Sequence, residues 1–364
     1  MKHQITLLGG QILPVYIGIV DRKPNVVHIL YTKETVRLKN RLVNQIFGYK
    51  VFDYQIEPYD YQSIEDAVTK IICDNEDAIF ELNLTSGTKL MALASQKVFQ
   101  TLECFSFYID QNQNLIDLSN GNKQKLDIEI STKTFLALSN HDEFSSVSLK
   151  TFSIDENKLA NSIFELRKIN SGLKGLFHLF RKTNVKADLL EYSYKDKKYG
   201  VNWKGNKLSV IAPKFNLEST GSNSFKILTT GLWWELIVGN AVSSWKSARE
   251  IHMSLIIKSN ANVKLDKNEI DILINTGQKM LFIECKSGVV LQSDINKMRA
   301  ISKFYGGISS KSILVSFYKP KEEFIEKCQD FGIELFFLEE SNKKHIELKT
   351  IANKLDQMFS KIEI

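Results

Sequence analysis

Two short apolar stretches in the last third of the chain carry charged residues at alternate positions, and this pattern constrains the fold more than any other. They span residues 268–274 and 281–288. Alternation with a period of two predicts two β-strands. In the first strand, three isoleucines fall on one face and Asp271 on the other. In the second strand, Glu284 and Lys286 share one face. Three charged groups therefore gather at the ends of otherwise apolar strands.

This clustering of charge predicts a catalytic site. Burying a charge without a purpose costs on the order of several kcal/mol, so charged residues in apolar strands need an explanation. Two carboxylates offer the oxygen ligands that divalent cations prefer, and a neighbouring ammonium group can stabilise negative charge. Hydrolysis of a phosphodiester bond needs both, so we predict a nuclease site. A surface hairpin with a solvated ion pair is the simpler alternative.

The same residues resemble the motif of the PD-(D/E)xK nuclease superfamily, whose fold many restriction enzymes share. In that motif an Asp on one strand precedes a Glu-x-Lys on the next. Asp271 matches the Asp, and Glu284-Cys285-Lys286 matches the Glu-x-Lys. A preceding helix often adds an acidic residue, and Glu235 is well placed for that role. The chain departs from the motif in having no Pro before Asp271.

The resemblance implies a metal-dependent endonuclease with a restriction-endonuclease-like α/β domain. Mg²⁺ or Mn²⁺ would be bound by Asp271, Glu284 and the backbone carbonyl of Cys285, because hard oxygen ligands select such ions. Lys286 would stabilise charge on the attacking water or on the phosphate. Glu235 would help to position metal or water. The implied catalytic residues are thus Glu235, Asp271, Glu284 and Lys286.

Length and composition bound the remaining possibilities. A chain of 364 residues is expected to form two domains. No apolar run approaches the roughly 20 residues of a membrane span, and the start of the chain lacks a signal peptide. The four cysteines show no C-x-x-C spacing, so neither a disulfide framework nor a zinc cluster is indicated. We therefore expect a cytoplasmic protein that does not contact membranes.

Charge is distributed unevenly along the chain. Residues 1–150 have 15 Lys and Arg against 18 Asp and Glu, whereas residues 151–364 have 33 against 24. The second part is therefore the better candidate for contacting a polyanion. Within it, the segment 155–225 has 13 basic and 7 acidic residues, with tyrosines and Trp203 among the lysines. This segment would either hold a nucleic-acid strand by charge and stacking or pack its aromatic side chains inward.

The first 150 residues predict a mostly parallel, doubly wound sheet. Apolar strands at 5–8, 26–31, 78–82 and 104–109 alternate with stretches of helical spacing. Such sheets bind ligands at the carboxyl ends of their strands. Two loops fall there, at 9–11 and 85–89, and their small residues let backbone N–H groups approach an anion. A simple helix cap at 85–87 is the alternative.

The segment from Leu82 to Ala92 also resembles the signature of CARF domains, the CRISPR-associated Rossmann-like sensors. Followed by a PD-(D/E)xK nuclease, such a domain is typical of the ancillary nucleases of type III CRISPR systems. The resemblance implies a sensor that dimerises and binds a cyclic oligoadenylate, most often cyclic tetraadenylate, and thereby switches on cleavage of DNA, RNA or both. The implied ligand-binding residues are Gly9, Gly10, Gln11, Thr85, Ser86, Gly87, Thr88 and Lys89, with Thr32 and Lys33 as weaker candidates.

These patterns predict the following domains. Residues 1–140 form the sensor, the polar stretch 141–154 is a linker, and residues 155–364 form the nuclease domain. The nuclease domain would consist of a basic connecting segment, 155–225, and a catalytic core, 226–364. Two other functions remain open. One is a restriction-type endonuclease with a different regulatory ligand, and the other is a non-catalytic, ligand-sensing regulator that binds nucleic acid.

Overall fold

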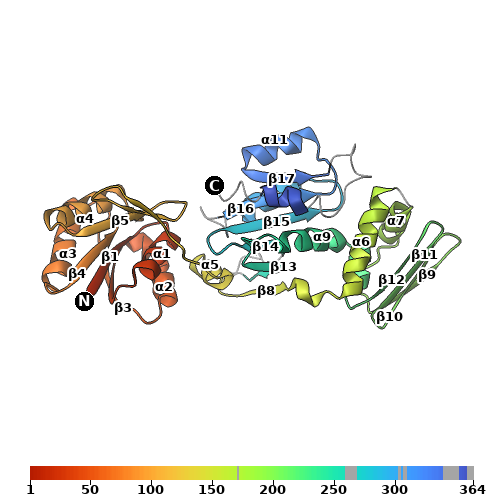
Figure 1. Cartoon of the computed structure of the whole chain (residues 1–364), viewed down its shortest axis with the longest axis horizontal. Helices are drawn as coiled ribbons and strands as arrows, with labels where there is room; N and C mark the ends of the chain where they lie inside the picture. Colours follow the sequence, from red (N-terminus) through yellow and green to blue (C-terminus); the bar gives the residue numbers. More distant parts are fainter. Residues whose placement is uncertain (170–171, 259–268, 302–304, 306–309, 339–351, 359–364) are drawn as a thin grey trace. The chain divides into compact units, whose positions relative to one another are not determined.

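The computed structural model describes residues 1–169, 172–258, 269–301, 305, 310–338 and 352–358. The chain forms two compact units, Met1–Asp142 and Glu143–Ile364. Each unit has its own helices and β-sheet structure (Figure 1). Each also has its own clusters of buried apolar residues. No helix among the described residues is long and apolar enough to cross a membrane. We describe each unit by itself.

The first unit is built on a seven-stranded sheet in the order β3-β2-β1-β4-β5-β6-β7. Its strands are β1 (Lys2–Leu8), β2 (Val26–Tyr31), β3 (Lys50–Gln55), β4 (Ile79–Asn83), β5 (Phe105–Ile109), β6 (Asn114–Asp117) and β7 (Lys123–Lys125). The first five strands run parallel, and β6 and β7 are antiparallel. The chain adds strands on one side of β1 and then returns to place β4 on its other side. The carboxyl ends of β1 and β4 therefore meet at the switch point of the sheet.

Helices cover both faces of this sheet. They are α1 (Leu13–Arg22), α2 (Val36–Gln45), α3 (Tyr61–Cys73), α4 (Lys89–Thr101) and α5 (Thr132–Leu138), with a short 3₁₀ helix at Lys33–Thr35. Successive residues of β1 point to opposite faces. Ile5 and Leu7 pack with α3 and α4, whereas Leu8 packs with α1 and α2. Burial on both faces explains why this strand reads as a continuous apolar run rather than an alternating one.

The second unit contains a six-stranded sheet in the order β17-β16-β15-β14-β13-β8. Its strands are β8 (Phe144–Val147), β13 (Glu250–Ile257), β14 (Glu269–Asn275), β15 (Met280–Lys286), β16 (Ser310–Ser316) and β17 (Ile333–Phe337). The pairs β8–β13, β13–β14 and β14–β15 are antiparallel, and the pairs β15–β16 and β16–β17 are parallel. The strand pair predicted from the charged pattern is the centre of this sheet. Asn268, where that pattern begins, lies outside the described residues.

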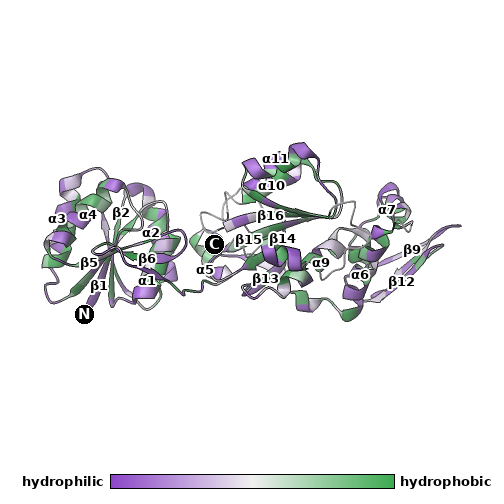
Figure 2. Cartoon of the chain, turned by 45° about the horizontal axis from the view of Figure 1, so that its top comes forward, coloured by the Kyte–Doolittle hydropathy of each residue, from purple (hydrophilic) through white to green (hydrophobic). Residues whose placement is uncertain are grey.

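Two apolar clusters cover this sheet, one on each face. The helices of the unit are α6 (Ile154–Lys168), α7 (Leu173–Lys182), α8 (Ser224–Thr229), α9 (Leu232–Ser243), α10 (Gln292–Ile301) and α11 (Glu322–Asp330). The large cluster includes α9, whose Trp233 and Trp234 are fully buried. The Trp234 indole N–H donates to the carbonyl of Val315, 3.0 Å away, which fixes α9 against β16. The smaller cluster lies under α10 and α11. Figure 2 shows hydrophobic residues along the strands between these helices.

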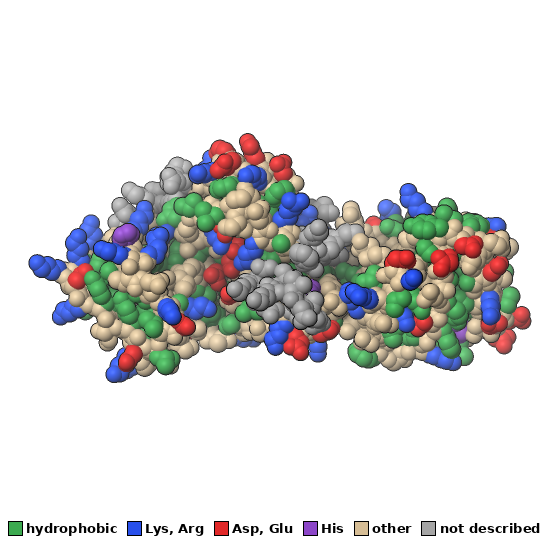
Figure 3. All heavy atoms as spheres, turned by 180° about the vertical axis from the view of Figure 1, so that it is seen from behind, with side chains coloured by type: hydrophobic (Ala, Val, Ile, Leu, Met, Phe, Trp, Pro, Cys, Tyr) green, Lys and Arg blue, Asp and Glu red, His purple; other side chains and the backbone are tan. Residues whose placement is uncertain are grey.

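A four-stranded antiparallel sheet, in the order β12-β11-β10-β9, belongs to the same unit. Its strands are β9 (Glu191–Lys195), β10 (Gly200–Lys204), β11 (Lys207–Ala212) and β12 (Phe215–Thr220). Trp203 is buried, stacks on Phe225 with ring centroids 5.8 Å apart, and donates to the carbonyl of Leu189. Three tyrosines, at 192, 194 and 199, pack beside it against the core. The aromatic residues of the basic segment therefore pack inward, whereas the lysines of this sheet and its turns are exposed, at 195, 197, 198, 204, 207 and 214. Figure 3 shows Lys and Arg side chains on the surface of this part of the chain.

Several elements differ from the sequence-based expectation. The predicted linker, 141–154, contains β8, which pairs with β13 as the edge strand of the nuclease-unit sheet. Helical spacing of apolar residues predicts one helix across 158–180, but the structure has α6 and α7 there, and Gly172, just before α7, adopts a left-handed backbone conformation. The elements β3, α3, β6, β7 and α5 were not predicted. The same spacing predicts a final helix at 346–359, and residues 352–358 are helical. The remainder of that stretch lies outside the described residues.

Candidate active site and ligand loops

The predicted catalytic residues meet at the ends of β14 and β15. Asp271 of β14 is half-buried, and its Oδ2 accepts a hydrogen bond of 2.7 Å from the backbone N–H of Cys285. One residue earlier in β15, Glu284 is only 1% exposed. Its Oε1 lies 2.8 Å from the Nζ of Lys286, as expected for residues two apart on one face of a strand. The antiparallel pairing of the two strands thus brings Asp271, Glu284, Cys285 and Lys286 together.

Helix α10 adds two charged side chains that we did not predict. The Nζ of Lys297 lies 2.6 Å from Glu284 Oε2, so both oxygens of this carboxylate contact an ammonium group. Asp294 Oδ1 lies 3.2 Å from the Nζ of Lys286. Residues three apart share one face of a helix. An Asp and a Lys at this spacing, just after the Glu-x-Lys strand, could therefore have predicted that the helix places both side chains at the site. Gln292, the first residue of the same helix, forms hydrogen bonds with Asn296 and Lys327 and not with the catalytic residues.

Glu235 lies in the first turn of α9 and is half-buried. Burial raises its pKa well above the usual range, and the charge of Asp271 adds to this shift. A Cβ added at Gly231 would lie 3.3 Å from Ser287 Oγ and 3.8 Å from Glu235 Oε1. The start of α9 therefore lies against the end of β15, with Glu235 beside the other carboxylates. Its placement agrees with the prediction, and its role stays a proposal.

The site holds more negative charge than its surroundings can balance. Burial raises the pKa of Asp271 to about 7, and the nearby Glu284 carboxylate contributes, while Lys297 and the Cys285 N–H act in the other direction. Burial disfavours the ammonium form of Lys286, but the charge of Glu284 and their hydrogen bond outweigh this and raise its pKa. Lys286 therefore stays charged at neutral pH. A cation at this position would stabilise the ionised carboxylates.

The donor atoms suit a hard divalent cation. Asp271 and Glu284 offer carboxylate oxygens, the ligands that Mg²⁺ and Mn²⁺ prefer. The Cys285 side chain is buried in the apolar cluster on the face of β15 opposite Glu284 and Lys286, which leaves its backbone carbonyl as the donor on the side of the carboxylates. No group of three or more His, Cys, Asp or Glu side chains among the described residues is arranged to hold a metal ion. Both Glu284 oxygens contact a lysine ammonium group, so a metal ion could bind this carboxylate only by replacing at least one of these contacts.

The two predicted ligand loops of the first unit meet at the switch point of its sheet. The Gly9 N–H donates to Ser86 Oγ over 2.9 Å. A Cβ added at Gly9 would lie 2.6 Å from the backbone N of Gly87, so only glycine allows this approach. Gly87 has a φ of +91°, which also favours glycine. Gly10 and Gln11 are exposed beside this contact.

Residues around Thr85 fix the shape of the second loop. Asn83 Oδ1 accepts hydrogen bonds from both the N–H and the hydroxyl of Thr85. The Thr85 hydroxyl oxygen also accepts from the N–H of Ile109. Thr88 caps α4 by accepting from the N–H of Met91, and Lys89, the first residue of that helix, is exposed. The predicted helix cap is therefore present at Thr88 rather than at 85–87. Asn83 was missed, although an Asn two residues before a Thr is typical of an Asx-turn.

The weaker candidates Thr32 and Lys33 follow β2. Thr32 is buried, and its hydroxyl donates to Glu34 and lies within a local cap with Thr35. This hydroxyl is therefore already used within its own turn. Lys33 is exposed at the same edge of the sheet, because β2 runs parallel to β1.

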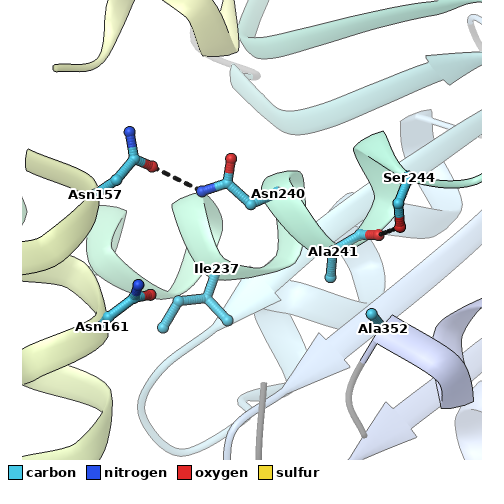
Figure 4. Close-up of a pocket in the computed structure, with 7 residues that line it drawn as sticks. All are labelled: Asn157, Asn161, Ile237, Asn240, Ala241, Ser244 and Ala352. Atoms are coloured by element: carbon cyan, nitrogen blue, oxygen red, sulfur yellow. Dashed lines mark hydrogen bonds between the residues drawn. The ribbon is translucent and has the colours of Figure 1, made fainter. Parts of the chain in front are cut away.

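A groove between α6 and α9 is separate from the catalytic residues. Its volume is about 430 Å³, and its lining consists of amide, hydroxyl and small apolar side chains: Asn157, Asn161, Ile237, Asn240, Ala241, Ser244 and Ala352. Figure 4 shows Asn240 donating to Asn157 across it. None of these side chains is ionisable, so the groove offers no acid, base or charged metal ligand.

Comparison with known proteins identifies both units. Residues 4–139 match the family model of the Card1 CARF domain, and residues 223–353 match that of the Card1-like endonuclease domain. The chain therefore combines a Card1 CARF domain with a Card1-like endonuclease domain. This result confirms the predicted family and the predicted α/β fold class. No curated protein sequence matches the chain.

Solved structures agree with this fold. Can2 from Sulfobacillus thermosulfidooxidans, in complex with cyclic tetra-adenylate, is 20% identical, with a TM-score of 0.69 over 100% of this chain and 98% of that chain. Protein VC1899 from Vibrio cholerae is 15% identical, with a TM-score of 0.76 over 99% and 98%. A type III CRISPR defence DNA nuclease activated by cyclic oligoadenylate is 15% identical, with a TM-score of 0.54 over 90% of this chain and 51% of that chain.

The first prediction concerns the contact between the ligand loops. Gly9→Ala should lower the free energy of unfolding of the first unit by about 1–3 kcal/mol, because the added methyl group overlaps the backbone of Gly87. Gly10→Ala is the matched control, since a Cβ at Gly10 meets nothing within 4 Å. Urea denaturation of the two variants measures the difference. Equal stability of the two variants would contradict the close approach of the loops.

The second prediction concerns the pH dependence set by Asp271. Its folded pKa of about 7 exceeds its ordinary value of 3.8, so the folded carboxyl binds its proton more tightly than the unfolded one. The free energy of unfolding should therefore fall as pH rises from about 4 to about 7. In metal-free protein at about pH 8, Asp271→Asn should be more stable than wild type by on the order of a few kcal/mol.

Thermal unfolding of metal-free protein across this pH range tests the second prediction. The stability gain of Asp271→Asn should shrink toward about pH 4, because the folded wild-type carboxyl is then protonated and no longer carries a buried charge. Asp155→Asn, which changes an exposed aspartate of α6, is the control and should show no such gain. A destabilised Asp271→Asn variant at every pH would show that the carboxylate is a structural ion-pair partner.

Proposed function

We propose that this chain is a metal-dependent nuclease of type III CRISPR defence that a cyclic oligoadenylate switches on. The observation that carries the proposal is the convergence of Asp271, Glu284 and Lys286 within a Card1-like endonuclease domain. The CARF domain in the same chain supports control by a nucleotide ligand. The likeness in fold to Can2, whose structure contains cyclic tetra-adenylate, supports that ligand in particular.

In the proposed reaction, Asp271, Glu284 and the Cys285 carbonyl would hold Mg²⁺ or Mn²⁺. When bound there, such an ion would supply Lewis-acid stabilisation of the phosphate and lower the pKa of a bound water. Lys286 stays protonated beside Glu284 and stabilises the negative charge that develops on the phosphate. Glu235 positions the attacking water. Lys297 balances the Glu284 carboxylate when the ion is absent.

In the sensor, the loops at 9–11 and 85–89 bind the ligand. Their backbone N–H groups and hydroxyls suit phosphate oxygens, and the exposed Lys89 and Lys33 add positive charge. A ring with twofold symmetry contacts two copies of these loops only if two sensor domains form a C₂ dimer. We therefore propose a homodimer in which ligand shifts the nuclease units by contacts that differ between the inactive and active arrangements. DNA, RNA or both serve as substrate.

The third prediction concerns catalysis. Cleavage should require Mg²⁺ or Mn²⁺ and stop in EDTA. Lys286→Ala should lower turnover by about 10²–10³-fold, because it removes charge stabilisation at the phosphate, while ligand binding is retained. Glu235→Gln should also lower turnover, with a change in melting temperature of no more than a few degrees. Rates come from cleavage of labelled DNA and RNA.

Lys158→Ala, which removes an exposed lysine of α6, is the control for this assay and should cut as fast as wild type. Full activity in EDTA, or wild-type rates for Lys286→Ala, would remove the catalytic assignment. A chain that binds the ligand and nucleic acid but never cuts would instead be a non-catalytic regulator.

The fourth prediction concerns activation. Without ligand the protein should be a dimer that cuts slowly or not at all. Cyclic tetraadenylate should accelerate cutting and compact the dimer, which small-angle scattering would detect. Lys89→Glu should weaken ligand binding by charge repulsion and so prevent activation, with the metal site intact. A monomer in solution, or a Lys89→Glu variant still activated at low ligand concentration, would contradict this scheme.

A further inference from the structure

Arg167 of α6 reaches the catalytic end of β15 from outside the catalytic core. Its Nη2 donates to the backbone carbonyl of Ser287 over 3.1 Å. Ser287 directly follows Lys286, whose own carbonyl accepts from the N–H of Phe317 at 2.7 Å. The Ser287 side chain lies close to Gly231, at the start of α9, where an added Cβ would be 3.3 Å from Ser287 Oγ. Arg167 therefore contacts the residue that follows Lys286, and that residue in turn lies against the start of the helix that carries Glu235.

Three aromatic rings hold this guanidinium in place. Its Cζ lies 5.5 Å from the centroid of Phe177, 5.7 Å from that of Phe317 and 5.3 Å from that of Tyr318. Phe177 belongs to α7, whereas the other two rings follow β16. Contacts with three rings and with the Ser287 carbonyl limit the rotation of the side chain, so the direction of its donors is largely fixed before any ligand arrives.

The charge of Arg167 is not balanced by a carboxylate among the described residues. Ser287 O is the hydrogen-bond acceptor found for it there, and Nε is buried without a partner. Burial lowers its pKa, yet an arginine side chain keeps its proton in proteins. A half-buried cation that is rigidly held and lacks an anion is unfavourable as a purely structural feature. The same properties suit a group that binds an anion supplied by a ligand.

We propose that Arg167 binds a backbone phosphate of the nucleic-acid substrate, next to the phosphate that is cleaved. The inference rests on the proposed nuclease function and deepens it by naming a substrate contact outside the catalytic core. The planar guanidinium matches phosphate geometry, and it contacts the carbonyl of Ser287, the residue that follows Lys286. The contact to Ser287 would keep the bound phosphate in register with Lys286. Arg167 is thus a substrate-positioning residue.

The test is the salt dependence of nucleic-acid binding by the full-length, metal-free protein in EDTA, with saturating cyclic tetraadenylate present. Each phosphate contact contributes about 0.7–0.9 to the slope of log K against log salt concentration. Arg167→Gln should lower this slope by about one contact and weaken binding of a labelled DNA or RNA on the order of tenfold at low salt. With metal, KM should rise more than kcat falls.

Two further variants keep the test decisive. Arg299→Gln removes the same charge and a similar ring contact, over Phe331, from an exposed position of α10, and should leave slope and affinity unchanged. Arg167→Lys keeps the positive charge, and it provides the test if Arg167→Gln does not fold. It should keep the slope but bind several-fold more weakly, because the planar fork is lost.

The outcomes separate this inference from the function on which it rests. If wild type neither binds nor cuts nucleic acid, the proposed function fails. If wild type binds and cuts, but Arg167→Gln keeps the wild-type slope or Arg167→Lys keeps the wild-type affinity, only the inference on Arg167 is overturned. A lowered melting temperature with unchanged slope would show that Arg167 is a structural clamp on Ser287.

Discussion

The burial of several carboxylates close together, at the ends of two apolar strands, is the constraint on which the second unit depends. Asp271 and Glu284 are held close by strand pairing, because the N–H of Cys285 donates to Asp271 while Glu284 lies one residue earlier. Two lysines balance Glu284, but Asp271 keeps a pKa of about 7. The surrounding sheet and the buried tryptophans of α9 maintain this unfavourable arrangement. A site that stores such repulsion favours binding of a cation, which is the chemical basis of the proposed nuclease.

The first unit depends on a different constraint, the close approach of two loops at one sheet edge. Gly9 and Gly87 meet because strand order places β4 beside β1. The backbone N–H groups of these loops, rather than large side chains, then form the surface offered to a ligand. Asn83 and Ser86 hold that surface in shape with bonds inside the protein. A preformed surface of this kind loses little conformational freedom on binding a ring-shaped anion.

Local sequence predicted the parts of the molecule whose partners are near in the chain. Alternation defined β14 and β15, because one face of each carries charge and the other packs on α9. The helix cap and the glycines marked the loops at 9–11 and 85–89. Arg167, Asp294 and Lys297 were missed because their contacts depend on how helices pack on the sheet. The polar β8 was read as a linker because an edge strand buries few side chains and lacks an apolar pattern.

Proton release on metal binding tests the central claim most directly. If Asp271 is partly protonated near neutral pH and is a metal ligand, Mn²⁺ must displace its proton. Calorimetric titration at about pH 6.5, in two buffers of different ionisation enthalpy, should show Mn²⁺ binding coupled to release of up to about one proton. The release should disappear in Asp271→Asn. Mn²⁺ binding without proton release in wild type, or no binding at all, would contradict the account.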